Sequence, residues 1–489
     1  MTAAEGLQMV LNSGVKMGAL EKAIGSIKDA EALAKALKTV EGSMFYSLVS
    51  SFWTPIEFLS FLGFAMIIAF MALIMAKRMT AVSALILIPL IFALIAGTGP
   101  AVGKMMMGGV AKISSTAMML LFAIIYFGIM IDVGLFDPLV IRILRIVKGD
   151  PVKVMVGLVC MTAVVALDGD GSTTFMIITT AFLPLFIRLK MSPIILAVFA
   201  LMTNNVLNIL PWGGPTARVV AALNLEANDV FLPLVPGMIV SFFFVLAVAY
   251  AVGLRERKRL GVTEMDEATL NEIATKISEE GKELKRPGKF MINLAVTVVM
   301  LGVLVADVFP LALIFAIGTC VALMINFGTL KEQTQRLCDH AAEALNVVII
   351  IIAAGCFMGI LSGTKMDEAI TRSLVSIIPP SLGPHMALIT AFLSAPGTFF
   401  LSNDAFYYGI VPILAKTAAG YGIQPVEIAR ASLMGQPIHF LSPLVGALWL
   451  LLGITNVSLG DIQKYAFPVA AGMMIIYIIV GGALGVITL

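Results

Sequence analysis

Residues 167–175 read LDGDGSTTF and separate two apolar stretches, at 152–167 and 173–187. Each stretch is shorter than the roughly 20 apolar residues that a simple membrane span needs. Two short apolar limbs joined by a polar tip are typical of a re-entrant hairpin, which enters and leaves the membrane on one side. The glycines of the tip permit a tight turn with positive φ. We therefore predict a hairpin in this part of the chain.

The same arrangement recurs in the second half, where the tip FFLSNDAFYYG begins at Phe399 between apolar limbs at 385–400 and 405–419. Two longer segments, 193–224 and 426–454, can cross a membrane but contain Pro, Gly and polar residues in the middle. Non-helical backbone at membrane depth is tolerated only when it is buried in protein or lines a wet cavity. We expect these four irregular segments to face one another.

The rest of the chain is strongly apolar. Of its 489 residues, 60% are hydrophobic and 13% are charged, against roughly 25% charged residues in soluble domains. This balance excludes a large soluble domain, a disordered protein and a nucleic-acid-binding protein, since the last two need high charge. We predict an all-α, multi-pass protein of the cell membrane, with regular spans at 57–76, 80–99, 117–136, 229–254, 290–308, 310–328, 345–362 and 465–487.

A charged linker, 255–289, divides the membrane part into two halves. An amphipathic extension, 1–55, precedes the first half at 56–254, and the second half runs over 290–489. Each half has three spans, a hairpin, a broken span and a last span, so the pattern predicts two repeats of five spans and one hairpin.

The positive charges predict the orientation. With the linker in the cytoplasm, most basic residues fall in cytoplasmic loops. The short external loops then hold six basic residues, namely Lys104, Lys112, Lys365, Arg372, Lys416 and Arg430. In this orientation the first hairpin enters from the cytoplasm and the second from outside, so the halves are inverted copies. Inverted repeats with interrupted helices characterise secondary transporters.

The first hairpin tip carries the first candidate site residues. Asp168 and Asp170 lie between glycines, and Ser172 and Thr173 follow at an expected helix start. Ionisable groups inside a membrane are costly and usually functional, so we predict that both aspartates bind a coupling ion or proton. Hydroxyls and N–H groups at a helix start suit an anion, which assigns Ser172 and Thr173 to the substrate. Capping of the second limb is the competing role of the aspartates.

The first broken span, NNVLNILPWGGPTAR, runs from Asn204 to Arg218. Its prolines and glycines cannot continue a helix, and the break frees backbone carbonyls. The guanidinium fork of Arg218 suits a carboxylate, although this side chain can instead snorkel to the outer interface. We predict that this segment binds substrate through Asn204, Asn208, Gly213, Gly214, Thr216 and Arg218.

The second hairpin tip and the second broken span, GQPIHFLSP from Gly435, complete the predicted site. We assign Asp404 and His439 to the coupling ion or proton, with capping and a neutral hydrogen-bonding histidine as their alternatives. The predicted substrate ligands here are Ser402, Asn403, Gln436 and Ser442. Asp132 and Asp137 fall near a span end, where interfacial solvation explains them.

Several functional classes remain open at this point. No phosphate-binding glycine loop occurs, which favours an ion gradient as the energy source. A Na⁺- or H⁺-coupled carrier of a dicarboxylate or another oxyanion fits the same pattern. An intramembrane aspartyl protease using Asp168 or Asp170 with Asp404 is a remote alternative, because paired aspartates can share a proton. That enzyme does not need inverted repeats.

The motifs resemble those of the citrate–divalent metal:proton symporter family, within the ion transporter superfamily. The matching text is LDGDGSTTF, LPWGGPTAR, FLSNDAFYYGIVPIL, YGIQPVEIARASL and GQPIHFLSPLVGALWLL. The resemblance runs from about residue 57 to the C-terminus. It implies import of citrate as a complex with Mg²⁺, Ca²⁺ or a similar ion, together with protons. It also implies a homodimer in lipid, two inverted repeats with hairpin tips at the substrate, no cofactor, and a metal that arrives with citrate instead of occupying a dedicated protein site.

Overall fold

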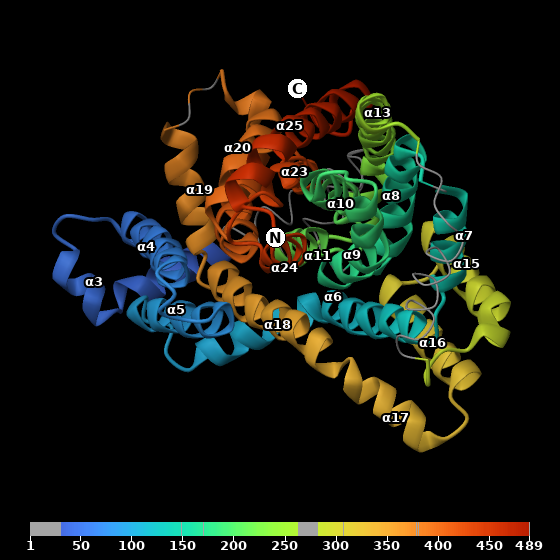
Figure 1. The fold of residues 1–489 in the computed structure, drawn as a ribbon. Coiled ribbons are helices and arrows are strands. Elements are labelled where there is room, and N and C mark those ends of the chain that lie inside the picture. The colour runs from blue at the N-terminus through green and yellow to red at the C-terminus, as the bar shows by residue number, and fades with distance from the viewer. Residues whose placement is uncertain are drawn as a thin grey trace, which may run out of the picture.

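The computed structural model describes residues 31–147, 149–169, 171–262, 282–306, 308–377, 379 and 381–488. All regular elements within these ranges are helices (Figure 1). In the described residues, eight helical segments are long and apolar enough to cross a membrane. The prediction of an all-α polytopic membrane protein is therefore confirmed.

The first half of the chain contains α3 (Met44–Val49), α4 (Pro55–Met75), α5 (Ala81–Ile95), α6 (Ala101–Asp132), α7 (Asp137–Val147), α8 (Pro151–Val165), η1 (Ala166–Asp168), α9 (Gly171–Arg188), α10 (Pro193–Leu207), α11 (Gly214–Leu223), α12 (Ala227–Phe231), η2 (Leu232–Leu234) and α13 (Val235–Leu260). The helices α8 and α9 fall on the limbs of the first predicted hairpin, and α10 and α11 are the two parts of the first broken span. The breaks lie where the sequence places Gly and Pro.

The second half contains η3 (Pro287–Lys289), α15 (Phe290–Val305), α16 (Leu311–Asn326), α17 (Leu330–Asp339), α18 (Ala341–Gly363), α19 (Met366–Ile377), η4 (Gly383–His385), α20 (Met386–Phe400), η5 (Ala405–Ile410), α21 (Val411–Ala419), α22 (Pro425–Leu433), α23 (Gln436–His439), α24 (Gly446–Thr455) and α25 (Leu459–Ala483). Of these, η5 is a π-helix. The limbs of the second predicted hairpin are α20 and the pair η5–α21.

The re-entrant layout and the inverted repeat stay predictions. Pro151–Asp168 and Gly171–Arg188, the limbs of the first predicted hairpin, each have 18 residues and are themselves apolar enough to cross a membrane. The linker residues 263–281 and residues 1–30 of the predicted extension lie outside the described residues.

Two boundaries differ from the sequence prediction. Helix α6 begins at Ala101 and not near residue 117, so Lys104 and Lys112 lie on a helix and not in a loop. Helix α13 continues to Leu260, so the first basic residues of the predicted linker form its last turns. Hydropathy undervalued both helix ends, because lysines and arginines lower the mean while their side chains remain good helix formers. Basic residues also stabilise a helix C-terminus.

The long helices α6 and α18 pack against each other in the middle of the molecule (Figure 1). A Cβ atom on Gly109 would lie 2.0 Å from the carbonyl oxygen of Gly355, and one on Gly359 would lie 2.2 Å from the carbonyl oxygen of Met105. The two backbones therefore touch, and only glycine fits at these positions. Close packing of this kind holds helices together in lipid, where burial from water contributes little.

Each of these long helices ends in the same way. Gly134 (φ 77°) follows the end of α6, and Lys365 (φ 61°) follows the end of α18. A left-handed residue after a helix turns the chain away from the helix axis. In each case a short helix follows with an aspartate in its first turn, Asp137 in α7 and Asp367 in α19. The sequence prediction treated both short helices as loops, since they have too few apolar residues to look like spans.

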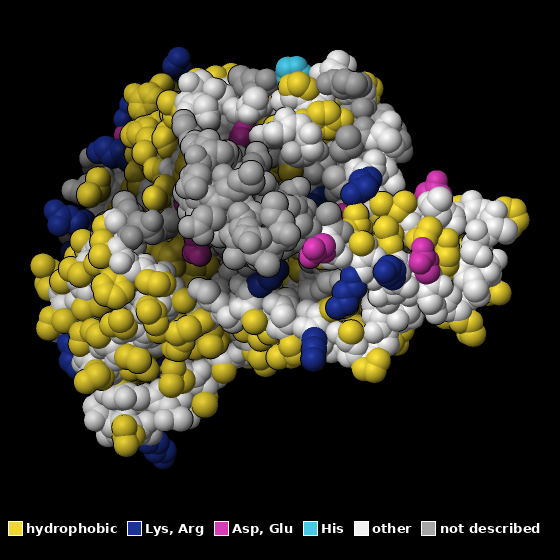
Figure 2. Space-filling model, turned by 180° about the vertical axis from the view of Figure 1, so that it is seen from behind, with side chains coloured by type: hydrophobic (Ala, Val, Ile, Leu, Met, Phe, Trp, Pro, Cys, Tyr) yellow, Lys and Arg dark blue, Asp and Glu magenta, His cyan; other side chains and the backbone are white. Residues whose placement is uncertain are grey.

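The outer surface carries many apolar side chains. Figure 2 shows hydrophobic side chains gathered over much of one face of the molecule. On α15, the side chains of Met291, Val298 and Val299 are all exposed, and Met324 is exposed on α16. An exposed apolar surface of this extent marks contact with another apolar phase, which for a polytopic protein is lipid.

Candidate functional site

The break between α10 and α11 has a fixed shape. A Cβ atom on Gly213 would lie 2.0 Å from the carbonyl oxygen of Asn208, so this glycine is needed for the turn. The Thr216 hydroxyl donates a hydrogen bond of 2.8 Å to the carbonyl of Ile209. Both residues were predicted as substrate ligands. In the structure, the close contact at Gly213 and the hydrogen bond of Thr216 both stabilise the break between the two helices. Their predicted role toward a substrate is not tested by this geometry.

The tip between α8 and α9 packs on that break. Gly169 has φ 80°, and a Cβ atom there would lie 2.9 Å from Cδ1 of Trp212. The indole N–H of Trp212 donates a hydrogen bond of 2.9 Å to the carbonyl of Leu167. The Trp212 ring also stacks on Phe127, with ring centroids 5.6 Å apart. Trp212 was not among the predicted site residues. Its polar N–H group inside a broken span is the sequence feature that could have identified it.

Asp168 lies where this tip turns into α9. Its side chain is buried and accepts a hydrogen bond of 3.3 Å from the hydroxyl of Thr174. The amide nitrogen of Asn204 lies against the tip, 3.3 Å from the position that a Cβ on Gly171 would take. Asp170, the second predicted coupling acid of this tip, lies outside the described residues.

The strongest polar contact of the region joins the two halves of the chain. The Arg218 Nε atom lies 2.7 Å from Oδ1 of Asp404, and its Nη1 donates to the carbonyl of Gly214 at 3.0 Å. Both side chains are largely buried, at 17% and 15% exposure. Snorkelling to the interface, the alternative for Arg218, therefore does not describe this structure. Removing one partner from a buried pair leaves an uncompensated charge, which is strongly destabilising.

Asp404 directly precedes the π-helix η5. The backbone N–H of Ala405 donates to the Ser402 hydroxyl at 3.2 Å, so Ser402 helps to start the new limb. Single π-helical turns occur frequently at functional sites, because their wider turn re-aims side chains. Here the π-helix carries Tyr407 and Tyr408, both fully buried.

A second polar network lies next to this turn and centres on Gln436. Its side-chain nitrogen donates to the Tyr407 hydroxyl at 2.7 Å and to Oδ1 of Asn403 at 3.3 Å. The Tyr407 hydroxyl in turn donates to the carbonyl of Ser432 at 3.2 Å. Asn205 joins the network from the first half, donating to the backbone carbonyl of Gln436 at 2.9 Å. Asn205 and Tyr407 were not among the predicted site residues.

His439 and Ser442 bind the end of α20. The Nδ1 atom of His439 lies 2.6 Å from the carbonyl oxygen of Thr398, and the Ser442 hydroxyl donates to the carbonyl of Phe399 at 2.6 Å. Because a carbonyl only accepts, Nδ1 carries the proton in this contact. The two side chains satisfy carbonyls that a helix end leaves without a partner.

One cavity of about 290 Å³ connects the first tip, the first break and the long helices. This is near the lower limit of the roughly 300–1,000 Å³ typical of small-molecule sites. We call it the His340 cavity; its lining residues are Leu120, Ile124, Phe127, Gly128, Ile131, Asp132, Asp168, Gly169, Thr173, Trp212, Gly214, Arg218, His340, Glu343 and Val347. Of the predicted site residues, it unites Asp168, Thr173, Gly214 and Arg218. Ser172, Asn208, Gln436 and Ser442 do not line it.

The His340 cavity also has titratable groups that the sequence prediction did not assign to a site. His340 Nε2 lies 2.9 Å from Oδ2 of Asp132, and the same oxygen lies 3.5 Å from Arg336. The imidazole packs on Gly128, where a Cβ atom would lie 2.5 Å from its Nδ1. Asp132 was interpreted as an interfacial residue, and the structure instead pairs it with a histidine that faces a cavity. No local motif reveals this pair, because the partners are far apart in sequence.

Comparison with known proteins gives a consistent picture. Residues 70–435 match the model of a family described as citrate transporter. A citrate transporter of Bacillus subtilis is 51% identical over 88% of this chain and 100% of its own length. A Mg(2+)/citrate complex secondary transporter of the same organism is 46% identical over 88% of this chain and 99% of its own length. The solved structure of MtrF from Neisseria gonorrhoeae, described with a class of antimetabolite efflux pumps, shares the fold at 14% identity and a TM-score of 0.53, covering 78% of this chain and 84% of that one.

Proposed function

The chain belongs to the citrate transporter family, and from that premise we propose that it imports citrate as a complex with a divalent metal ion, coupled to protons. It is a multi-pass membrane transporter and not an enzyme, which excludes the intramembrane protease. The names of both Bacillus subtilis relatives support citrate as the substrate, and one of them supports the Mg²⁺ complex.

The observation that carries the proposal is the ion pair between Arg218 and Asp404 beside the His340 cavity. A guanidinium binds a carboxylate through two parallel N–H donors. In the structure, Nε binds Asp404 and Nη1 binds the carbonyl of Gly214. A carboxylate of citrate that enters the cavity competes with Asp404 for the same donors. Arg218 is thus the proposed substrate ligand.

Competition at Arg218 also supplies a means of coupling. When citrate takes the guanidinium, Asp404 remains as a buried carboxylate without its cation. Such a group is costly in the charged state and takes up a proton. Substrate binding and proton binding then favour each other, as symport requires. Asp168 and Asp170 remain predicted coupling groups. Asp404 is the acid that would take up a proton when citrate displaces it from Arg218.

The charge of the His340 cavity suits a metal–citrate complex better than free citrate. Among the described residues, its lining has three carboxylates, Asp132, Asp168 and Glu343, and one permanently cationic residue, Arg218. A bound divalent ion cancels two of the three negative charges of citrate. The metal in this proposal is cargo: citrate faces the arginine while the metal side faces the acids. The predicted homodimer belongs to the same proposal.

The proposal is tested by uptake of labelled citrate into proteoliposomes with a pH gradient, a Na⁺ gradient or neither. Each gradient is combined with Mg²⁺, Ca²⁺ or a chelator. Stimulation by a divalent ion and by an inward proton gradient is the expected result. Equal uptake of free citrate in all conditions would overturn both the metal and the proton part. Stimulation by Na⁺ alone, or preference for a dicarboxylate competitor, would establish the alternative carrier.

A further inference from the structure

A second and larger cavity, of about 580 Å³, lies at the other end of the α6–α18 pair. We call it the lysine cavity, because Lys104, Lys112, Lys365 and Lys416 all line it. Of the described residues that line it, Asp367 is the one carboxylate. In a chain with only 13% charged residues, four cations around one cavity form a marked concentration of positive charge.

Two of the lysines stand on one face of α6. Lys104, Gly108 and Lys112 follow each other at intervals of four residues, so the two lysines are separated by about 12 Å along the helix. A Cβ atom at Gly108 would meet no atom within 4 Å, so open space lies between the two side chains. Throughout the described part of the chain, neither the Lys104 nor the Lys112 side chain takes part in a hydrogen bond or ion pair.

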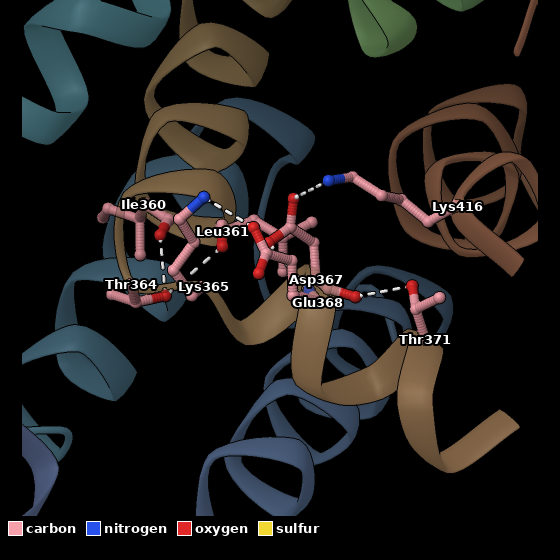
Figure 3. A network of polar contacts seen from close by, with 8 residues as sticks. All are labelled: Ile360, Leu361, Thr364, Lys365, Asp367, Glu368, Thr371 and Lys416. Atoms are coloured by element: carbon pink, nitrogen blue, oxygen red, sulfur yellow. Dashed lines mark hydrogen bonds and ion pairs between the residues drawn. The ribbon is translucent and has the colours of Figure 1, made fainter. Parts of the chain in front are cut away.

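The other two lysines are held by acids at the start of α19 (Figure 3). Lys416 Nζ lies 3.1 Å from Oδ2 of the buried Asp367, and Lys365 Nζ lies 2.5 Å from Oε1 of Glu368. The Thr371 hydroxyl donates to the carbonyl of Asp367 at 2.7 Å and supports the first turn. These pairs fix the positions of two ammonium groups, while Lys104 and Lys112 stay available to an incoming anion.

The lysine cavity and the His340 cavity share three helices. Helix α11 places Gly214 and Arg218 at the His340 cavity, and Ala221 to Asn224 at the lysine cavity. A helix of 10 residues is about 15 Å long, so Arg218 lies within one short helix of the lysines. Helices α6 and α18 line the His340 cavity with one end and the lysine cavity with the other.

We propose that the lysine cavity is a second, outer binding site for the polycarboxylate substrate, occupied before citrate reaches Arg218. This inference rests on the proposed function and adds a step to it. A cleft of one charge with low-dielectric walls focuses the field and raises the local concentration of counter-ions. In the predicted orientation all four lysines face the outside, where the substrate arrives. Clustered ammonium groups suit a polyanion without demanding one geometry.

The first test measures uptake kinetics in the full chain. The variant Lys104→Gln/Lys112→Gln removes the charges while it keeps polar, unbranched side chains and a similar helix propensity, and Arg372→Gln, a basic residue of α19 outside the cavity lining, serves as the matched control. At low ionic strength we expect the double variant to lower uptake at subsaturating citrate by about tenfold, since steering changes on-rates by roughly 10- to 1,000-fold. The maximal rate should stay unchanged, which also shows that the variant folds. High salt should remove the difference, because screening shortens to about 3 Å at 1 M.

The second test measures binding of labelled citrate with Mg²⁺ to purified protein. Arg218→Gln removes the inner ligand, so the binding that remains in this variant reports on the outer site. We expect weak, salt-sensitive binding in Arg218→Gln that disappears when Lys104→Gln/Lys112→Gln is added. Binding of phosphatidylglycerol vesicles that depends on Lys104 and Lys112, without salt-sensitive citrate binding, would assign the cavity to a lipid headgroup and overturn the proposal.

The two proposals fail in different ways. If the wild type transports no citrate under any gradient, the proposed function is wrong. If the wild type transports citrate while the double lysine variant matches Arg372→Gln at low salt, only the outer site is wrong. Absence of citrate binding by Arg218→Gln that unfolds at the same temperature as the wild type, with normal uptake in the wild type, also overturns only the outer site.

Discussion

The His340 cavity and the lysine cavity share three helices, and their described lining residues differ in charge. Acids outnumber permanent cations around the first, and lysines outnumber acids around the second. Helices α6, α11 and α18 contribute to both. Each of these helices therefore contributes to two environments of different charge, one at each cavity. An anion meets attraction first at one end and a single arginine at the other.

The largest expected effect comes from removing the cation of the His340 cavity. Arg218→Gln should lower citrate uptake at least about thirtyfold, because truncating one partner of a buried charge pair costs about 2–5 kcal/mol. Arg218→Lys should also be strongly impaired, since a point charge cannot replace a planar fork. Initial uptake rates at equal protein insertion give the measurement. Near-normal uptake by Arg218→Gln would show that Arg218 of the His340 cavity is not the substrate ligand.

The next effect separates two predicted coupling acids, Asp404 and Asp168. Asp404→Asn should abolish stimulation of uptake by an inward proton gradient and lower the driven rate about tenfold. Asp168→Asn should lower the proton stimulation less, because the proposed exchange takes place at Asp404, and should also raise the Mg²⁺ concentration needed for half-maximal uptake; Asp168 accepts its hydrogen bond from the Thr174 hydroxyl of α9. The pH profile and the Mg²⁺ titration of both variants provide the readout. Equal loss of proton stimulation in both would mean that the acids act as one unit.

A smaller effect is expected where α6 and α18 pack against each other. Gly359→Ala places a Cβ atom 2.2 Å from a backbone oxygen of α6, whereas Gly108→Ala places one in open space. We expect Gly359→Ala to destabilise the protein by roughly 1–3 kcal/mol, the cost of overpacking, and Gly108→Ala to be neutral. Thermal unfolding of the purified protein compares the pair. Equal unfolding temperatures would mean that α6 and α18 can move apart at Gly359 without loss of stability.

The smallest effect concerns the helix that joins the cavities. Thr216→Val removes the hydrogen bond to the carbonyl of Ile209 and leaves that carbonyl without this donor. The expected loss of stability is about 1 kcal/mol, and Thr216→Ser should restore it. A structural role predicts that citrate affinity changes little in Thr216→Val. A large loss of citrate affinity with normal stability would instead show that Thr216 binds substrate, as predicted from sequence.

Much of the fold could be predicted from sequence, because apolar runs and their interruptions determine spans and breaks directly. The helices α8, α9, α20 and α21 fall where hydropathy and polar tips placed them. The start of α6 was missed, since lysines at a helix end resemble a loop when only hydropathy is counted. The amphipathic helices α7 and α19 were missed because they have too few apolar residues to look like spans.

The site could be predicted only in part. Residue type and depth identified Arg218 and Asp404 correctly as polar groups inside apolar sequence, but their pairing spans 186 residues and no spacing rule reveals it. Gly213 and Thr216 show the reverse difficulty, because a residue that shapes a break and one that binds a ligand look alike in sequence. His340 and Asp132 were invisible as a pair, since each sits at a helix end where solvation is the ordinary explanation.

The Arg218–Asp404 pair has a consequence for the electrical behaviour of the protein. The paired site carries no net charge when it is empty. Under the proposed exchange, a metal–citrate complex with one negative charge takes Arg218 while Asp404 takes one proton, and the loaded site is again neutral. The membrane voltage, which acts with about 2.3 kcal/mol per charge per 100 mV, then does no work on that exchange. Any electrical current that accompanies uptake is then carried by protons that bind at groups other than Asp404.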